Sequence, residues 1–123
     1  MPNNLVLGDC HTHLDQYDAA DMAEILERAK ESRVTFAVCA GTTIESTRAC
    51  IELAESYGPL YAGIGIHPME ARDQVTDRVY AELETLAKSS PKVVCISEVG
   101  LDYLPESPDH QTQDQVFRQH IRL

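Results

Sequence analysis

Two histidines flanked by carboxylates lie close to the start of the chain, in residues 9–15, which read DCHTHLD. In an extended segment, residues two positions apart point to the same side, so Asp9, His11 and His13 share one face. Two imidazoles at this spacing can hold one divalent metal ion. The flanking aspartates and the position directly after a strand-like run favour a metal site over a pair of surface histidines.

A third histidine follows a later apolar run, in residues 63–68, which read GIGIHP. The two glycines allow close approach of neighbouring backbone, and the proline restricts the conformation of His67 directly before it. A single histidine of this kind is more often a packing residue. Beside the His-x-His motif, a role of His67 in the same site is favoured.

A carboxylate ends the next apolar run, in residues 97–103, which read SEVGLDY. Glu98 follows the apolar run Val93–Ile96, where an unpaired carboxylate would be costly, and a metal ion would stabilise its charge. The alternative is a buried ion pair, although no basic residue follows before Arg118. Asp102 and Tyr103 fit two interpretations equally: orienting a ligand or substrate group, and capping a loop.

Four apolar runs of strand length must position these side chains, and helical segments separate them. The runs show little alternation, which is typical of strands buried on both faces of a parallel sheet. They occupy Leu5–Cys10, Val34–Ala40, Leu60–Ile66 and Lys92–Glu98. Between them, apolar residues recur at helical spacing, and Thr42 precedes Glu45 at the spacing of a capping box. This alternation predicts a parallel α/β fold, whose strand carboxyl ends share one edge.

The strand–helix units recur at intervals of roughly 30 residues, as βα units do. A fifth apolar stripe, formed by Val116, Phe117, His120 and Ile121, lies just before Leu123. A (β/α)₈ barrel takes roughly 250 residues, so four units amount to about half of one. The residues alone leave a smaller open sheet as the other interpretation.

Composition excludes several classes of protein. With 43% hydrophobic and 24% charged residues the chain is typical of a soluble globular protein. Its formal charge of −10 disfavours broad, charge-driven nucleic-acid binding, but permits an enzyme that neutralises one phosphate with metal ions. No apolar run approaches the roughly 18 residues of a membrane helix, and no secretory signal is evident, so we expect a cytoplasmic protein. Cys39, Cys50 and Cys95 are expected to be reduced core residues.

In order and spacing, the three motifs and residues 115–123 (QVFRQHIRL) resemble the N-terminal half of the TatD-type metal-dependent deoxyribonucleases, within the amidohydrolase-like barrels. The resemblance covers the whole chain and rests on motifs at three separate strand ends. It implies an α/β fold, a (β/α)₈ TIM-type barrel, of which this chain covers about the first four βα units. Residues 1–123 would then be the N-terminal half of a single hydrolase domain.

The resemblance also implies a hydrolytic site with two divalent metal ions, whose identity among zinc, manganese and magnesium stays open. It assigns His11 and His13 to one metal, makes Glu98 the bridge between both, and places His67 near the scissile phosphate. His67 and Glu98 are therefore the catalytic candidates. The remaining ligands of that family, two histidines and an aspartate from later strands, have no counterpart before Leu123.

The expected activity is hydrolysis of phosphodiester bonds in DNA or short oligonucleotides by metal-activated water. We expect it of the complete protein, with little or none from this chain alone. Asp102 and Tyr103 are the candidates for contacting substrate. No membrane partner and no obligate protein partner are indicated.

Two alternatives stay open. One is another His-x-His barrel enzyme acting on small molecules, such as a polymerase-and-histidinol-phosphatase-type phosphoesterase or a cyclic amidohydrolase, which the acidic charge slightly favours. The other is a non-catalytic half-barrel that self-associates through the unpaired edges of its first and fourth strands. The sequence contains no Gly-x-Gly-x-x-Gly, Walker A or Gly-x-Ser-x-Gly motif that would indicate a different chemistry.

Overall fold

The computed structural model describes residues 5–72 and 76–123, which form a four-stranded parallel sheet with helices between the strands. The strands lie in the order of the sequence: β1 (Leu7–Thr12), β2 (Val34–Ala40), β3 (Leu60–Ile64) and β4 (Val93–Ile96). The helices are α1 (Met22–Glu31), α2 (Ile44–Ser56), α3 (Asp77–Ala87) and α4 (His110–Arg122), with short 3₁₀ turns at Leu14–Gln16 and Pro68–Glu70. This alternation confirms the predicted α/β fold.

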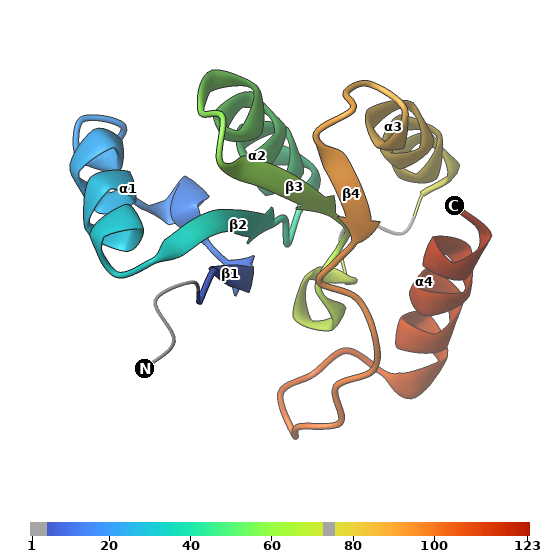
Figure 1. The fold of residues 1–123 in the computed structure, drawn as a ribbon. Coiled ribbons are helices and arrows are strands. Elements are labelled where there is room, and N and C mark those ends of the chain that lie inside the picture. The colour runs from blue at the N-terminus through green and yellow to red at the C-terminus, as the bar shows by residue number, and fades with distance from the viewer. Residues whose placement is uncertain (1–4, 73–75) are drawn as a thin grey trace.

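The helices α1, α2 and α3 lie along one face of the curved sheet, and α4 follows the long segment after β4 (Figure 1). The opposite face is lined by the alternate strand residues Phe36, Val38, Tyr61 and Val94, which form a shallow apolar hollow. Phe36 is 38% exposed and Val94 is 51% exposed. Burial of the strands on both faces was predicted, but most residues of the edge strands β1 and β4 are exposed, and the buried residues are concentrated in β2 and β3.

The core lies between the sheet and the helices. Met22, Cys50 and Leu60 are fully buried in a cluster that joins α1 and α2 to the sheet. A second cluster, which includes Leu83 and Val116, lies beneath α3 and α4. Burying one large aliphatic side chain stabilises a fold by roughly 1.5–3 kcal/mol, so these stripes hold the helices against the strands.

The stripe expected on α4 is confirmed for Val116 and His120 but not for Ile121, and the expected burial of Cys95 was wrong. The buried side of α4 consists of Gln113, Val116 and His120, whereas Ile121 is 70% exposed. The two polar residues are buried because neighbouring loops supply their hydrogen-bond partners. Cys95 is exposed rather than part of the core.

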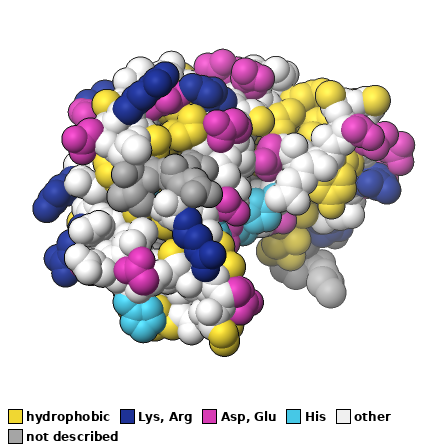
Figure 2. All heavy atoms as spheres, turned by 180° about the vertical axis from the view of Figure 1, so that it is seen from behind, with side chains coloured by type: hydrophobic (Ala, Val, Ile, Leu, Met, Phe, Trp, Pro, Cys, Tyr) yellow, Lys and Arg dark blue, Asp and Glu magenta, His cyan; other side chains and the backbone are white. Residues whose placement is uncertain are grey.

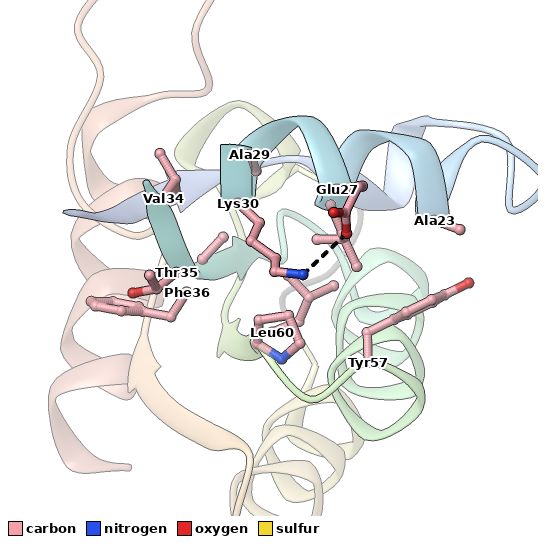
Figure 3. A pocket seen from close by; sticks show the side chains of 12 residues that line it. Ala23, Glu27, Ala29, Lys30, Val34, Thr35, Phe36, Tyr57 and Leu60 are labelled. Atoms are coloured by element: carbon pink, nitrogen blue, oxygen red, sulfur yellow. Dashed lines mark hydrogen bonds and ion pairs between the residues drawn. The ribbon is translucent and has the colours of Figure 1, made fainter. Parts of the chain in front are cut away.

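A cavity of about 490 Å³ opens between α1 and the first residues of β2 and β3 (Figure 3). Its lining is mostly apolar and includes Phe36 and Leu60, while Lys30 and Glu27, one turn apart on α1, pair at its edge at 3.5 Å between Nζ and Oε2. These residues lie at the amino ends of the strands, away from the carboxyl ends where the predicted site lies. None of the helices in the described part of the chain has the length and apolarity that crossing a membrane requires.

Candidate metal centre and active site

Four of the predicted site residues converge at the carboxyl ends of the strands. The Nε2 atoms of His11 and His13 each lie 3.4 Å from Glu98 Oε2. His67 Nε2 lies 3.6 Å from the other carboxylate oxygen, Glu98 Oε1. Three imidazoles from two strand ends therefore surround one carboxylate from a third.

Backbone hydrogen bonds bring the loops that follow β3 and β4 over the end of β2. The Glu98 N–H donates to the Gly41 carbonyl at 3.1 Å, and the His67 N–H donates to the Thr42 carbonyl at 2.8 Å. Gly41 and Thr42 directly follow β2. The chain after β2 thus fixes the backbone of both residues, which is why side chains 31 positions apart meet.

The glycine between β3 and His67 is required for this close approach. A Cβ atom on Gly65 would lie 2.9 Å from the Ser97 carbonyl oxygen and 2.7 Å from a Val99 methyl group. Both contacts are shorter than real Cβ contacts, so a larger residue would push the segment around Glu98 away. This confirms the close backbone approach that the sequence predicted at this position.

The hydrogen bonds of His13 and His67 give their rings opposite tautomers. His13 Nδ1 lies 3.1 Å from the Ala40 carbonyl oxygen, which only an Nδ1–H can satisfy, so Nε2 carries a free lone pair. His67 Nδ1 accepts a hydrogen bond from the Met69 N–H at 3.1 Å, so in the neutral ring Nε2 carries the proton. His13 is therefore prepared to bind a metal ion, and His67 is prepared to donate a hydrogen bond.

The donor set fits a divalent cation. One ligand atom each from His11, His13 and Glu98 lies within 4.8 Å of the others. Two imidazole nitrogens and one carboxylate oxygen suit zinc or manganese, and a site with three protein ligands keeps a position open for water or substrate. The side chains remain 47%, 32% and 31% exposed, so solvent reaches this position.

Asp102 and Tyr103 lie in the segment between β4 and α4. Asp102 Oδ1 accepts hydrogen bonds from the Leu104 N–H at 3.0 Å and the Ser107 hydroxyl at 3.1 Å, as a loop-capping residue does. Tyr103 is 59% exposed, and its ring lies 3.9 Å from the ring of His110 between centroids. In residues 5–72 and 76–123, no hydrogen bond or ion pair joins either side chain to the histidines or to Glu98. Their contact with substrate stays a prediction.

Two buried polar residues of α4 support the site, and the sequence reasoning did not identify them as such. His120 Nε2 accepts a hydrogen bond from the Ile66 N–H at 3.1 Å, and its Nδ1–H donates to the Val116 carbonyl at 2.8 Å. Ile66 directly precedes His67, so α4 fixes the backbone at that point. Gln113 connects α4 to the loop that holds Asp102. The only signal in the sequence was the helical spacing of these residues with Val116.

Replacement of His120 is expected to change how stability depends on pH. Burial lowers the pKa of His120, because it disfavours the imidazolium. Just below a pH of about 6.5 the unfolded chain therefore binds more protons than the folded chain, and the free energy of unfolding decreases as the pH falls. His120→Leu removes this contribution. As the pH falls, the free energy of unfolding of this variant, relative to that of the unmodified chain, should therefore rise by up to about 1.4 kcal/mol per pH unit. Urea unfolding of both chains at several pH values between about 7.5 and about 5.5 measures this difference. If the free energies of unfolding of the two chains change with pH in parallel, the prediction is wrong.

The surface carries charges of both signs. On the face shown in Figure 2, lysine and arginine side chains are scattered among acidic ones and form no continuous basic band. The formal charge of the chain is −10.

Comparison with known proteins finds relatives that match most of this chain. Residues 8–123 match the model of a family described as TatD related DNase. A metal-dependent hydrolase of Bacillus subtilis, YabD, is 38% identical over 120 residues, which cover 96% of this chain and 46% of that protein. A 3'-5' ssDNA/RNA exonuclease, TatD of Cronobacter turicensis, is 35% identical over 104 residues, which cover 84% of this chain and 38% of that protein.

The fold agrees with these matches. The crystal structure of YjjV, a TatD homologue from Escherichia coli, superposes with a TM-score of 0.85 at 28% identity, over 94% of this chain and 45% of that one. The fold is thus a partial (β/α)₈ barrel, as the resemblance implied. The chain spans about half the length of the curated relatives it matches.

Proposed function

This chain belongs to the family of TatD-related DNases, and on that premise we propose that it forms the N-terminal half of a hydrolase domain that cleaves phosphodiester bonds in DNA or short oligonucleotides. The observation that carries the proposal is the convergence of His11, His13 and His67 on the carboxylate of Glu98. The relative from Cronobacter turicensis is named a 3'-5' ssDNA/RNA exonuclease, which supports single-stranded nucleic acid as the substrate class.

His11 Nε2, His13 Nε2 and Glu98 Oε2 are the atoms that would hold a divalent cation. Such an ion, when bound, lowers the pKa of a bound water and stabilises negative charge on phosphate oxygens. The Ala40 carbonyl keeps the proton of His13 on Nδ1, so that Nε2 stays available as a ligand. The lone pair of His13 is thus directed by the end of β2.

His67 acts as a hydrogen-bond donor toward the substrate in this proposal. Its Nε2–H points toward Glu98 Oε1, and a phosphate oxygen beside Glu98 would compete for the same proton. The Met69 N–H holds the ring in the required tautomer. His67 would therefore orient the phosphate and offset part of its charge as the transition state forms.

Three protein ligands are fewer than a site with two metal ions needs. We therefore propose that the complete protein holds two divalent ions. The further ligands would belong to the half of the barrel that this chain does not cover. Hydrolysis then requires both halves of the barrel. Acidic small molecules, such as sugar phosphates, are the second candidate substrates, because the charge of −10 and the absence of a continuous basic band in Figure 2 favour short ligands.

The chain alone is expected to bind metal but to hydrolyse single-stranded DNA poorly. Loss of a positioned acid or base costs 10²–10⁴-fold, so its kcat should lie at least about 100-fold below a typical roughly 10 per second. A fusion should recover hydrolysis if it joins this chain to the part of the Cronobacter turicensis exonuclease that follows the region similar to this chain. The measurement is cleavage of an end-labelled oligonucleotide with manganese, beside a panel of dinucleotides, sugar phosphates and cyclic amides.

Matched variants of the fusion decide whether this chain supplies the site. Glu98→Gln should abolish the recovered cleavage, whereas Glu52→Gln, the same change on the exposed side of α2, should leave it intact. An ordinary rate from the 123-residue chain alone would contradict the two-halves proposal. A folded fusion that hydrolyses only sugar phosphates or cyclic amides would replace the nuclease with the second candidate.

A further inference from the structure

A second group of metal-ligating side chains lies behind the first, where the turn after β1, β2 and α2 meet. Cys39 on β2 and Cys50 on α2 are both fully buried, and their Sγ atoms lie 3.0 Å apart. Asp15, in the 3₁₀ turn after His13, places Oδ1 3.5 Å from Cys39 Sγ. The three ligand atoms all lie within 4.8 Å of one another.

The protons in this cluster form a chain. The Cys50 thiol donates to Cys39 Sγ, and the Cys39 thiol donates to the Asp15 carboxylate. The hydrogen bond from Cys50 lowers the pKa of the Cys39 thiol, and the same contact together with burial raises the pKa of Cys50. Cys39 is therefore the thiol that loses its proton more readily.

The spacing of these donors is close to that around a tetrahedral cation. With metal–sulfur and metal–oxygen bonds of about 2.3 and 2.0 Å, a tetrahedral ion separates two sulfurs by roughly 3.8 Å and sulfur from oxygen by roughly 3.5 Å. The distance from Asp15 Oδ1 to Cys39 Sγ already matches. The two sulfurs would need to move apart by less than an ångström, which side-chain rotation of Cys50 can supply.

Ser46 offers a fourth donor and a path to solvent. Its hydroxyl donates to Asp15 Oδ2 at 2.7 Å, and it lies one helical turn before Cys50 on α2. Asp15 and Ser46 are only partly buried, so the oxygen side of the cluster faces outward while the sulfur side lies in the core. An ion can therefore enter from the oxygen side, with water or Ser46 as its fourth ligand.

We propose that Asp15, Cys39 and Cys50 form a binding site for a thiophilic divalent cation, zinc or cadmium, separate from the site at His11, His13 and Glu98. Binding replaces the two thiol protons by two metal–sulfur bonds, and both protons are released to solvent. The oxygen donors favour this over a disulfide, because a carboxylate and a hydroxyl converging on two sulfurs complete a metal coordination shell but contribute nothing to a sulfur–sulfur bond.

The two sites differ in the ions that they prefer. Thiolates select soft cations, whereas imidazoles and carboxylates also accept manganese and magnesium. Manganese should therefore fill the first site alone, and cadmium should reach the second. Asp15 lies two residues after His13, and Cys39 directly precedes the Ala40 carbonyl that holds the His13 ring. An ion bound at Asp15, Cys39 and Cys50 would thus lie beside the backbone that positions His13 in the first site.

Cadmium binding to the chain with Cys10→Ser and Cys95→Ser tests the proposal, because only Cys39 and Cys50 then remain as thiols. We expect a thiolate-to-cadmium charge-transfer absorption in the ultraviolet that saturates at one ion per chain, with release of two protons. His13→Ala in the same background should keep this absorption. Cys50→Ala or Cys39→Ala should remove it, and Asp15→Asn should weaken cadmium binding at least about 10-fold.

The folded parent protein suffices to overturn the proposal if the core variants do not fold. Absence of the absorption, or its appearance without proton release, would do so. So would an absorption that persists in a folded Cys50→Ala chain. If the Cys10→Ser and Cys95→Ser chain, purified without reductant, shows no free thiols after unfolding, Cys39 and Cys50 form a disulfide. The proposed metal site is then wrong.

Discussion

The affinity of the chain for manganese is expected to fall at least about 100-fold when Glu98 is replaced by glutamine, since loss of outer-shell partners alone costs 10–100-fold. Glu98 Oε2 lies 3.4 Å from both His11 Nε2 and His13 Nε2. The amide keeps the size of the side chain and removes its charge. Isothermal titration with manganese, or electron paramagnetic resonance of the free ion, measures the change.

His67→Gln provides the matched control at the same carboxylate. His67 Nε2 carries a proton in the neutral ring, because Met69 donates to Nδ1, so this residue is not expected to bind the ion directly. Manganese affinity should stay within a few-fold of the unmodified chain, whereas oligonucleotide cleavage by the fusion should decline. Equal losses of affinity in Glu98→Gln and His67→Gln would contradict the division of roles between ligand and donor.

Replacement of Gln113 by leucine is expected to destabilise the chain by roughly 2–4 kcal/mol, although the residue belongs to none of the motifs that the sequence singled out. Its side chain is fully buried, and its amide makes three hydrogen bonds of 2.6 Å, to the Asp102 N–H and to the carbonyls of Asp102 and Pro108. Leucine of similar size leaves all three backbone groups without this partner. Urea unfolding monitored by circular dichroism gives the change in free energy.

Gln115→Leu is the control for this prediction, because Gln115 lies on the exposed side of the same helix. Exposed substitutions of this kind usually change stability by less than about 0.5 kcal/mol. The loop that carries Asp102 and Tyr103 should also exchange its amide hydrogens faster in the Gln113→Leu chain. If the two leucine variants unfold at the same urea concentration, Gln113 does not hold that loop to α4.

Much of the fold could be predicted from the sequence because strand and helix patterns are local. The alternation of apolar runs with helical stripes indicated four βα units, and the structure places four parallel strands whose ends lie within two residues of the predicted bounds. Small errors in the helix boundaries arose where two adjacent residues suit the same capping position. The N-cap of α2 is Thr43, whose side chain accepts from the Ser46 N–H at 3.1 Å, and not the adjacent Thr42. Two hydroxyl residues in sequence are equally suited to that position.

The convergence of the candidate metal ligands could be predicted for a similar reason. Residues two apart on a strand share a face, and the carboxyl ends of parallel strands share an edge, so His11, His13, His67 and Glu98 had to lie near one another. The family resemblance then implied their roles. Which ring nitrogen faces the carboxylate was decided only by tertiary contacts, through the Ala40 carbonyl for His13 and the Met69 N–H for His67.

The sequence by itself therefore determined the fold class and which histidines and carboxylate meet, since both follow from periodicity and from chain direction in a parallel sheet. Only the tertiary structure decided that Gln113 is buried and that His120 bonds to Ile66, because a polar residue on a helix resembles a solvent-facing one until a loop from elsewhere supplies its partner. Only the tertiary structure brought Cys39 and Cys50 to the same carboxylate of Asp15. Three separate elements contribute one donor each to that cluster, and no spacing along the chain encodes their distance.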